Sequence, residues 1–264
     1  MKRTRGWGIL LLCLMMGGVL LFPGARSEAA HAVNKYGGKT ISNPEGTVEL
    51  ARLNRDVWEY TTYGGNFGGM TNIPTNGLII SSSKGLVLID SSWDDDLTKE
   101  LLNMIRRHIG KKIAVAVITH SHEDRVGGIR ALLKEGIEVR STARTAQLAE
   151  KAGYPTPNPI LDEQSRFKVG NTIIETYYPG EGHSEDNITV WLPQHKILFG
   201  GCLIKSLEAK DLGNVNDANL EEWSRSIQNV LNRYPRMKQV VPGHGNVGDK
   251  GLLIHTLELL ENRN

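Results

Sequence analysis

The sequence predicts an α/β fold in which two mixed β-sheets pack face to face and helices cover their outer faces. Apolar segments rich in β-branched residues come first, and segments with apolar residues at helical spacing follow them. This order of strands and then helices occurs twice along the chain. Three prolines within residues 155–159 make a stiff connection between the two runs. We therefore expect one domain built from two αβ halves.

Four strands are expected to open the first half, at residues 47–53, 57–63, 76–82 and 85–90. The segment 64–70, between the second and third strands, is dominated by glycine and carries two apolar side chains, Phe67 and Met70. We expect it to be a mobile connection. Its composition leaves open whether it is a spacer or a flap over a site.

Helices follow these strands. Ser92 and Asp95 have the spacing of a capping box, with Asp in place of Glu, and predict the start of a helix there. Leu97, Leu101 and Ile105 then recur at the i, i+4 spacing of one helix face. A strand at residues 113–118, a short helix at 129–134 and a helix at 142–151 are expected to complete the first half.

The second half repeats the order. Strands are expected at residues 172–178, 188–192 and 196–199, followed by a helix that ends before Pro235. The apolar face of that helix consists of Leu220, Trp223, Ile227 and Leu231. A strand at 239–241 and a helix carrying Leu253, Leu257 and Leu260 close the chain.

The first thirty residues have the layout of a secretory signal peptide. Lys2, Arg3 and Arg5 precede an apolar run at residues 8–22, and small residues follow toward position 32. The apolar run is short for a membrane span. We expect residues 1–30 to be removed, with cleavage between 27 and 32, to leave a single exported domain at 31–264, periplasmic or secreted. The alternative is an uncleaved N-terminal anchor.

Removal of this segment changes the charge of the chain. It holds four of the 31 basic residues and one of the 29 acidic residues, so the remainder has a formal net charge of −1. No attraction to nucleic acid or to a membrane surface follows from such a balance. With 39% apolar and 23% charged residues, the composition is that of an ordinary globular protein.

One short segment carries three metal-ligand side chains. His120, His122 and Asp124 lie within five residues directly after the expected strand 113–118. Side chains at alternating positions after a strand can converge on one face of the following turn. Imidazole nitrogen and carboxylate oxygen are both ligands of catalytic Zn²⁺. This segment therefore indicates half of a metal site.

The other half is expected from His183, Cys202 and His244. Each follows an expected strand and has glycine neighbours, which let the backbone bring a ligand close to a metal. Taken singly, each histidine is more often a surface or capping residue, and the lone cysteine of the exported chain is more often an inert buried group. The shared context at four places favours a metal site.

Six candidate ligands exceed the needs of one tetrahedral Zn²⁺ and suit two. Two metals roughly 3.5–4 Å apart, with water between them, form a hydrolytic centre. Zinc lowers the pKa of bound water to about 7, so hydroxide is available at neutral pH. The sequence thus predicts a hydrolase with two zinc ions per chain.

The combined motifs resemble those of the metallo-β-lactamases, and within them subclass B1, over essentially the whole mature chain. The matching segments are Thr119-His120-Ser121-His122-Glu123-Asp124-Arg125, Pro179-Gly180-Glu181-Gly182-His183 with Asp186-Asn187, Gly200-Gly201-Cys202-Leu203-Ile204-Lys205, Leu212-Gly213-Asn214-Val215 and Pro242-Gly243-His244-Gly245. The resemblance implies the family's four-layer αβ/βα sandwich.

The resemblance also implies a role for each ligand. The first zinc would be bound by His120, His122 and His183, and the second by Asp124, Cys202 and His244. Arg125 stands where many members of the wider superfamily place a further histidine ligand. A guanidinium stays protonated and cannot coordinate zinc, so Arg125 is expected to orient the site through nearby acceptors.

Further residues match the family's substrate contacts. Lys205 would bind the carboxylate of the ring fused to the β-lactam, and Asn214 would help to stabilise the oxyanion. The resemblance assigns Asp124 and Asn214 to the catalytic step. Residues 63–71 correspond to the family's mobile flap, from which Phe67 or Met70 could cover an apolar substituent.

The expected activity is hydrolysis of the β-lactam amide bond of penicillins, cephalosporins and carbapenems without a covalent acyl-enzyme, which confers antibiotic resistance. We expect a monomer that binds these substrates and neither nucleic acid nor membrane after signal cleavage. Two alternatives stay open: a thioesterase or lactonase on the same fold, and a non-enzymatic zinc-binding protein.

Overall fold

The computed structural model describes residues 40–262, and the predicted signal peptide lies outside them. The described chain forms two β-sheets. The first has eight strands in sequence order: β1 (Thr40–Ser42), β2 (Val48–Arg52), β3 (Val57–Phe67), β4 (Met70–Ser82), β5 (Gly85–Ile89), β6 (Ile113–Val117), β7 (Glu138–Thr142) and β8 (Asn158–Leu161). Strands β1 to β5 pair antiparallel, and β5 to β8 pair parallel.

The second sheet has five strands in the order β13 (Gln239–Pro242), β12 (Ile197–Gly201), β11 (Thr189–Leu192), β10 (Thr172–Tyr177) and β9 (Gln164–Val169). All neighbours are antiparallel except β12 and β13, which are parallel. Both sheets are therefore mixed, and the chain passes from one to the other between β8 and β9.

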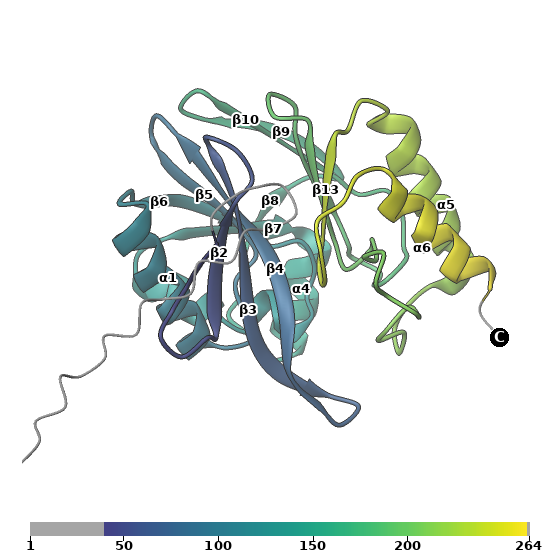
Figure 1. The fold of residues 1–264 in the computed structure, drawn as a ribbon, viewed down its shortest axis with the longest axis horizontal. Helices are drawn as coiled ribbons and strands as arrows, with labels where there is room; N and C mark the ends of the chain where they lie inside the picture. Colours follow the sequence, from purple (N-terminus) through teal and green to yellow (C-terminus); the bar gives the residue numbers. More distant parts are fainter. Residues whose placement is uncertain (1–39, 263–264) are drawn as a thin grey trace, which may run out of the picture.

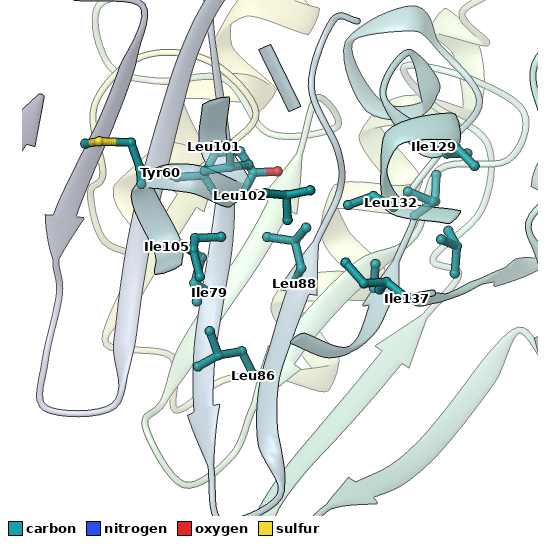
Figure 2. Close-up of a cluster of buried hydrophobic side chains, with 14 of the residues drawn as sticks. Tyr60, Ile79, Leu86, Leu88, Leu101, Leu102, Ile105, Ile129, Leu132 and Ile137 are labelled. Carbon is teal, nitrogen blue, oxygen red and sulfur yellow. The ribbon is translucent and has the colours of Figure 1, made fainter. Parts of the chain in front are cut away.

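Helices cover the outer face of each sheet (Figure 1). The helices are α1 (Asp95–His108), α2 (Glu123–Val126), α3 (Ile129–Lys134), α4 (Ala143–Lys151), α5 (Leu220–Arg233) and α6 (Gly251–Glu261). One apolar cluster joins the first sheet to α1 and α3 through residues such as Leu88, Leu101 and Leu132 (Figure 2). A second lies between the sheets, and a third joins the second sheet to α5 and α6. The predicted fold class, two mixed sheets between outer helices, is confirmed.

Most predicted elements are present within one or two residues of their expected ends, but four strands, β1, β7, β8 and β9, and one helix were not predicted. In β7 buried residues alternate with exposed or half-buried polar ones, and in β9 half-buried residues alternate with exposed polar ones, so the polar side chains hide the strand pattern. Strand β8 begins inside the proline-rich connection and includes Pro159. It tolerates this proline because it is an edge strand. The short helix α2 lies within the metal-ligand segment.

The predicted cap of α1 is wrong. The N-cap is Asp94, whose side chain accepts a hydrogen bond from the Leu97 amide at 2.7 Å. The hydroxyl of Ser92 instead donates to the buried Thr62 hydroxyl on β3 at 2.7 Å. Asp94 lies directly before the first helical residue, where a carboxylate satisfies a free amide and complements the helix dipole.

The glycine-rich segment 64–70 also differs from its prediction as a connection. Strands β3 and β4 continue through it as a hairpin, and Phe67 pairs with Met70 across the turn. The turn residues Gly68 and Gly69 both have positive φ, 58° and 83°, as a tight two-residue hairpin turn requires. This hairpin projects from the body of the molecule in Figure 1. No helix within residues 40–262 is long and apolar enough to cross a membrane.

Candidate metal centre and active site

Three histidine side chains meet at strand ends from both sheets. His120 and His122 follow β6, and His183 follows β10. Their rings stand edge to face, with centroids 4.7 Å apart for His120–His122, 5.0 Å for His120–His183 and 4.8 Å for His122–His183. One ring nitrogen of each lies within 4.8 Å of the others. Three nitrogen donors therefore face a common point.

The protonation of this histidine cluster suits a metal. Burial lowers the pKa of His120 and of His183 well below the ordinary imidazole value, so both are neutral at neutral pH. The buried Nε2 of His120 has no hydrogen-bond partner in the described chain. His122 donates from Nε2 to Asp217 at 2.7 Å, which leaves its Nδ1 facing His183 Nε2 at 3.0 Å. A metal ion would satisfy these inward-facing nitrogens.

A second cluster, made of Asp124, Cys202 and His244, adjoins the first. The Sγ of Cys202 lies 3.3 Å from His244 Nε2 and 3.5 Å from Asp124 Oδ2. His244 Nε2 also lies 3.3 Å from Asp124 Oδ2. His120, Asp124 and Cys202 place one ligand atom each within 4.8 Å of one another, so His120 borders both clusters. Carboxylate, thiolate and imidazole are all zinc ligands.

The orientation and charge of His244 follow from its neighbours. Its Nδ1 donates to the Pro74 carbonyl at 2.6 Å, which leaves Nε2 for the cluster. Burial lowers the pKa of His244, but the opposing effect of Cys202 and Asp124 is larger and raises this pKa from 6.5 to about 9. The cluster thus carries excess negative charge that attracts a proton or a metal cation.

Arg125 contacts two of the three ligands of this second cluster, Asp124 and Cys202. It is fully buried, and its Nη2 lies 3.0 Å from Cys202 Sγ, from the Gly243 carbonyl and from Asp124 Oδ2. Burial opposes ionisation of Asp124, but Arg125 holds the pKa of this carboxyl well below its usual range. A Cβ at Gly243 would lie 2.7 Å from both Arg125 Nη2 and Cys202 Sγ, so only glycine fits there. The prediction that Arg125 orients the site through acceptors agrees with these contacts.

Asp90 extends the network to the end of β5. Its φ is +68°, a conformation that few residues other than glycine adopt. Thr119 donates to it from its amide at 2.7 Å and from its hydroxyl at 2.9 Å, and Arg125 donates at 3.3 Å. Burial raises the pKa of Asp90 to about 6, although Arg125 opposes this. Asp90 therefore binds both Arg125 and Thr119, the residue before His120, and holds the two in place.

Residues 70–244 match the family model described as the metallo-beta-lactamase superfamily, which spans more than half of the chain. The chain belongs to this superfamily. It is 52% identical over 250 residues to a metallo-beta-lactamase type 2 from Bacillus sp. (strain 170), covering 95% of this chain and 96% of that one. A metallo-beta-lactamase type 2 from Bacillus cereus is 50% identical over the same shares.

The fold comparison agrees with the family. A solved metallo-beta-lactamase from Pontibacter korlensis superposes with a TM-score of 0.79 at 43% identity, covering 82% of this chain and all of that one. The family resemblance found in the sequence, including subclass B1, is confirmed by these relatives.

A cleft of about 680 Å³ opens over the two clusters of this metallo-β-lactamase superfamily member. One wall comes from the β3–β4 hairpin and includes Phe67 and Met70, whose side chains are 39% and 60% exposed. The opposite wall comes from residues 204–214 and includes Lys205 and Asn214. The structure thus brings every predicted site residue to one place, with His120 buried beneath the cleft floor.

Asn214 is oriented by its own loop. Its Oδ1 accepts a hydrogen bond from the Asn216 amide at 3.1 Å, as in a turn-forming Asn. No acceptor within residues 40–262 pairs with its Nδ2 at hydrogen-bond distance. The side-chain amide is therefore the group left to face a ligand in the cleft.

Several residues of the site were not predicted from the sequence. Thr75 donates from its hydroxyl to Asp124 Oδ2 at 3.1 Å, and Trp93 lines the cleft with its ring 6.4 Å from His244. Asp90 and Asp217 hold Arg125 and His122. The one available signal was Asp90 at the end of an apolar strand, where a carboxylate would be costly without a partner. The others carry no local signal.

Proposed function

We propose that this chain hydrolyses β-lactam antibiotics with two zinc ions, one held by His120, His122 and His183 and the other by Asp124, Cys202 and His244. The observation that carries this proposal is the pair of adjoining ligand clusters at the floor of one cleft. The family membership and the metallo-beta-lactamase relatives at about 50% identity give the reaction its class.

The donor set fits zinc in each position. Three imidazoles, one with an unpartnered buried Nε2, suit a site with an open fourth position. A thiolate and a carboxylate in the second cluster would neutralise much of a divalent charge. When bound, zinc would lower the pKa of a coordinated water so that the nucleophile forms at neutral pH. Asp124 would serve as a ligand and as a group that orients the nucleophile.

The cleft walls supply substrate recognition. Lys205 binds the carboxylate of the bicyclic β-lactam, which places the lactam carbonyl over the clusters. The Nδ2 of Asn214 donates to the carbonyl oxygen as negative charge develops there, an effect worth about 3–4 kcal/mol for one good donor in other enzymes. Phe67 and Met70 cover apolar substituents from the hairpin side.

No side chain attacks the substrate in this proposal. Cys202 is enclosed by Arg125, Asp124 and His244 and is only 3% exposed. These contacts suit a ligand and leave no room for a nucleophile. When the lactam C–N bond breaks, the nitrogen is protonated by solvent, and no covalent acyl-enzyme is formed.

The remaining parts of the proposal concern the cell. The predicted signal peptide would export a single domain, residues 31–264, as a monomer to the periplasm or the medium. There the enzyme would meet β-lactams before they reach their targets and so confer resistance.

Hydrolysis during zinc titration tests the proposal. Metal-free protein is titrated with zinc while turnover of one penicillin, one cephalosporin, one carbapenem and a glutathione thioester is followed. We expect zinc to restore hydrolysis of the β-lactams and not of the thioester. If zinc restores hydrolysis of the thioester alone, the chain is a thioesterase on the same fold. If two zinc ions bind and no substrate is hydrolysed, the chain is a non-enzymatic zinc-binding protein.

A further inference from the structure

Trp223 lies where its helix reaches the active site. It occupies the first turn of α5, its side chain is fully buried, and its Nε1 donates to the Leu203 carbonyl at 2.8 Å. In the sequence it is one residue of an apolar helix face. In the structure its ring also touches two polar side chains of the site. The ring centroid is 5.3 Å from Lys205 Nζ and 5.8 Å from the His183 ring.

The Lys205 ammonium lies over the face of the Trp223 ring. No carboxylate in residues 40–262 lies within ion-pair distance of Lys205 Nζ. Burial lowers the pKa of this lysine, and the charges of Cys202, Asp124 and Asp211 oppose this effect. An ammonium over an indole face is attracted by the quadrupole of the ring, and the attraction is stronger when both groups are desolvated. The ring therefore stabilises a cation that is otherwise without a partner.

The position of the Lys205 ammonium is confined from two sides. A Cβ at Gly182 would lie 3.1 Å from Trp223 Cδ1, so the ring packs closely against the backbone of the His183 segment. On the other side, a Cβ at Gly213 would lie 3.8 Å from Lys205 Nζ. The ammonium thus sits between the indole and the loop that carries Asn214.

We propose that Trp223 is a positioning residue, which holds the Lys205 ammonium at the cleft wall so that it receives the substrate carboxylate. The inference rests on the proposed function, because a carboxylate-bearing β-lactam is the ligand. The indole supplies the attraction that keeps the cation extended toward the cleft without neutralising it, as a carboxylate partner would.

Kinetics of Trp223→Phe and Trp223→Leu test this role. We expect KM for a penicillin to rise about threefold with Phe, which keeps an aromatic face, and about tenfold with Leu, with kcat changed less than about twofold. The matched control is Trp191→Phe, since Trp191 belongs to the same core cluster but stacks on Tyr234 at 5.0 Å, away from the site. Equal KM changes in the control and in Trp223→Phe would overturn the proposal.

A double-mutant cycle with Lys205→Gln separates the lysine from His183. If the ring acts through Lys205, Trp223→Phe adds nothing to KM in the Lys205→Gln background. If it acts through His183, the zinc content and kcat fall and the effects of the two substitutions add. This second result would overturn the proposal.

A measurement without substrate or metal keeps the test independent of the proposed function. In metal-free protein, the Lys205 ε-methylene protons should show an upfield NMR shift from the indole ring current, assigned by its loss in Lys205→Gln. We expect the shift to vanish in Trp223→Leu and to persist in Trp191→Phe. Absence of a shifted lysine resonance in the wild type would overturn the positioning role, whatever the substrate proves to be.

Discussion

The two ligand clusters of this site are built in opposite ways. The histidine cluster consists of side chains on loops, and Asp217 contacts its His122 from the surface with 54% of its own side chain exposed. The Asp124–Cys202–His244 cluster is enclosed by Arg125, Thr75 and the Pro74 carbonyl. His120 and His183 are buried as well, so the two clusters differ in their polar and charged surroundings and not in depth.

The difference follows from charge. Neutral imidazoles can be buried at little electrostatic cost, so the histidine cluster needs few partners. A carboxylate and a thiolate cannot, so the second cluster requires a buried cation and several donors. We therefore expect substitutions behind the second cluster to change the stability of the protein, and substitutions behind the first to change metal affinity alone.

The largest effect is expected from Arg125→Met. Loss of the guanidinium leaves Asp124, Asp90 and Cys202 buried without compensation, which costs about 3–5 kcal/mol in the free energy of unfolding. Urea denaturation of the metal-free protein measures this change. The control is Arg106→Met, which removes an exposed pair with Glu135 at 3.0 Å and should cost less than about 1 kcal/mol. Similar losses in both variants would contradict the comparison.

A buried carboxylate outside the site sharpens the role of Arg125. Glu59, on β3, is 8% exposed, and no ion pair to it is formed within residues 40–262. Burial, with a smaller contribution from Glu49, raises its pKa from 4.5 to about 8. Between these values the folded state keeps a proton that the unfolded state has lost, so stability falls as pH rises. Glu59 shows what a buried acid costs without an arginine.

Glu59→Gln should remove this pH dependence. We expect little change in stability at pH 4 and a gain of about 2–4 kcal/mol at pH 8, because glutamine cannot ionise. Thermal or urea unfolding across pH 4–9 measures it. The exposed Glu150→Gln is the control and should follow the wild type throughout. A variant curve parallel to the wild type would show that Glu59 ionises freely in the folded protein.

The same contrast explains what the sequence could predict. Helix α5 was identified because its apolar residues recur at a fixed local spacing. Three ligand-type residues were identified because they lie within five positions directly after a strand, and the other three because each follows a strand with glycine beside it. Strands β7 and β9 were missed because polar side chains interrupt the apolar pattern of each strand. Sequence patterns therefore predict the features that depend on residues close together in the chain.

The residues that contact the predicted zinc ligands could not be predicted from such patterns. Arg125 meets Asp90 across 35 positions, Thr75 meets Asp124 across 49, and His122 meets Asp217 across 95. No periodicity connects residues so far apart. The ligand types were predictable because zinc chemistry restricts them, whereas a supporting carboxylate or hydroxyl can come from any segment that the fold brings near.

Cys202→Ser is expected to weaken the second cluster alone. A serine hydroxyl stays protonated and is a poor zinc ligand, so affinity at this site should fall by about a hundredfold or more. The histidine cluster lacks any contact with Sγ and should keep its affinity. Zinc titration against a chelator resolves the two events. The complementary His122→Asn should weaken the first event and spare the second, and an unchanged titration of Cys202→Ser would refute the ligand assignment.

The smallest effect is expected from Asp217→Asn, at the surface behind the histidine cluster. Asparagine can still accept the hydrogen bond of His122 but has no charge, so the first zinc site should weaken by about tenfold, with the second site and the free energy of unfolding unchanged. Chelator titration and urea denaturation measure these, and Asn216→Ala, an exposed change on the same loop, is the control. A loss of stability comparable to that of Arg125→Met would mean that both clusters are anchored in the fold alike. Because Asp217 lies three residues from Asn214, a fall in kcat that exceeds the loss of metal would instead mean that this exposed pair aligns the oxyanion donor with the first cluster.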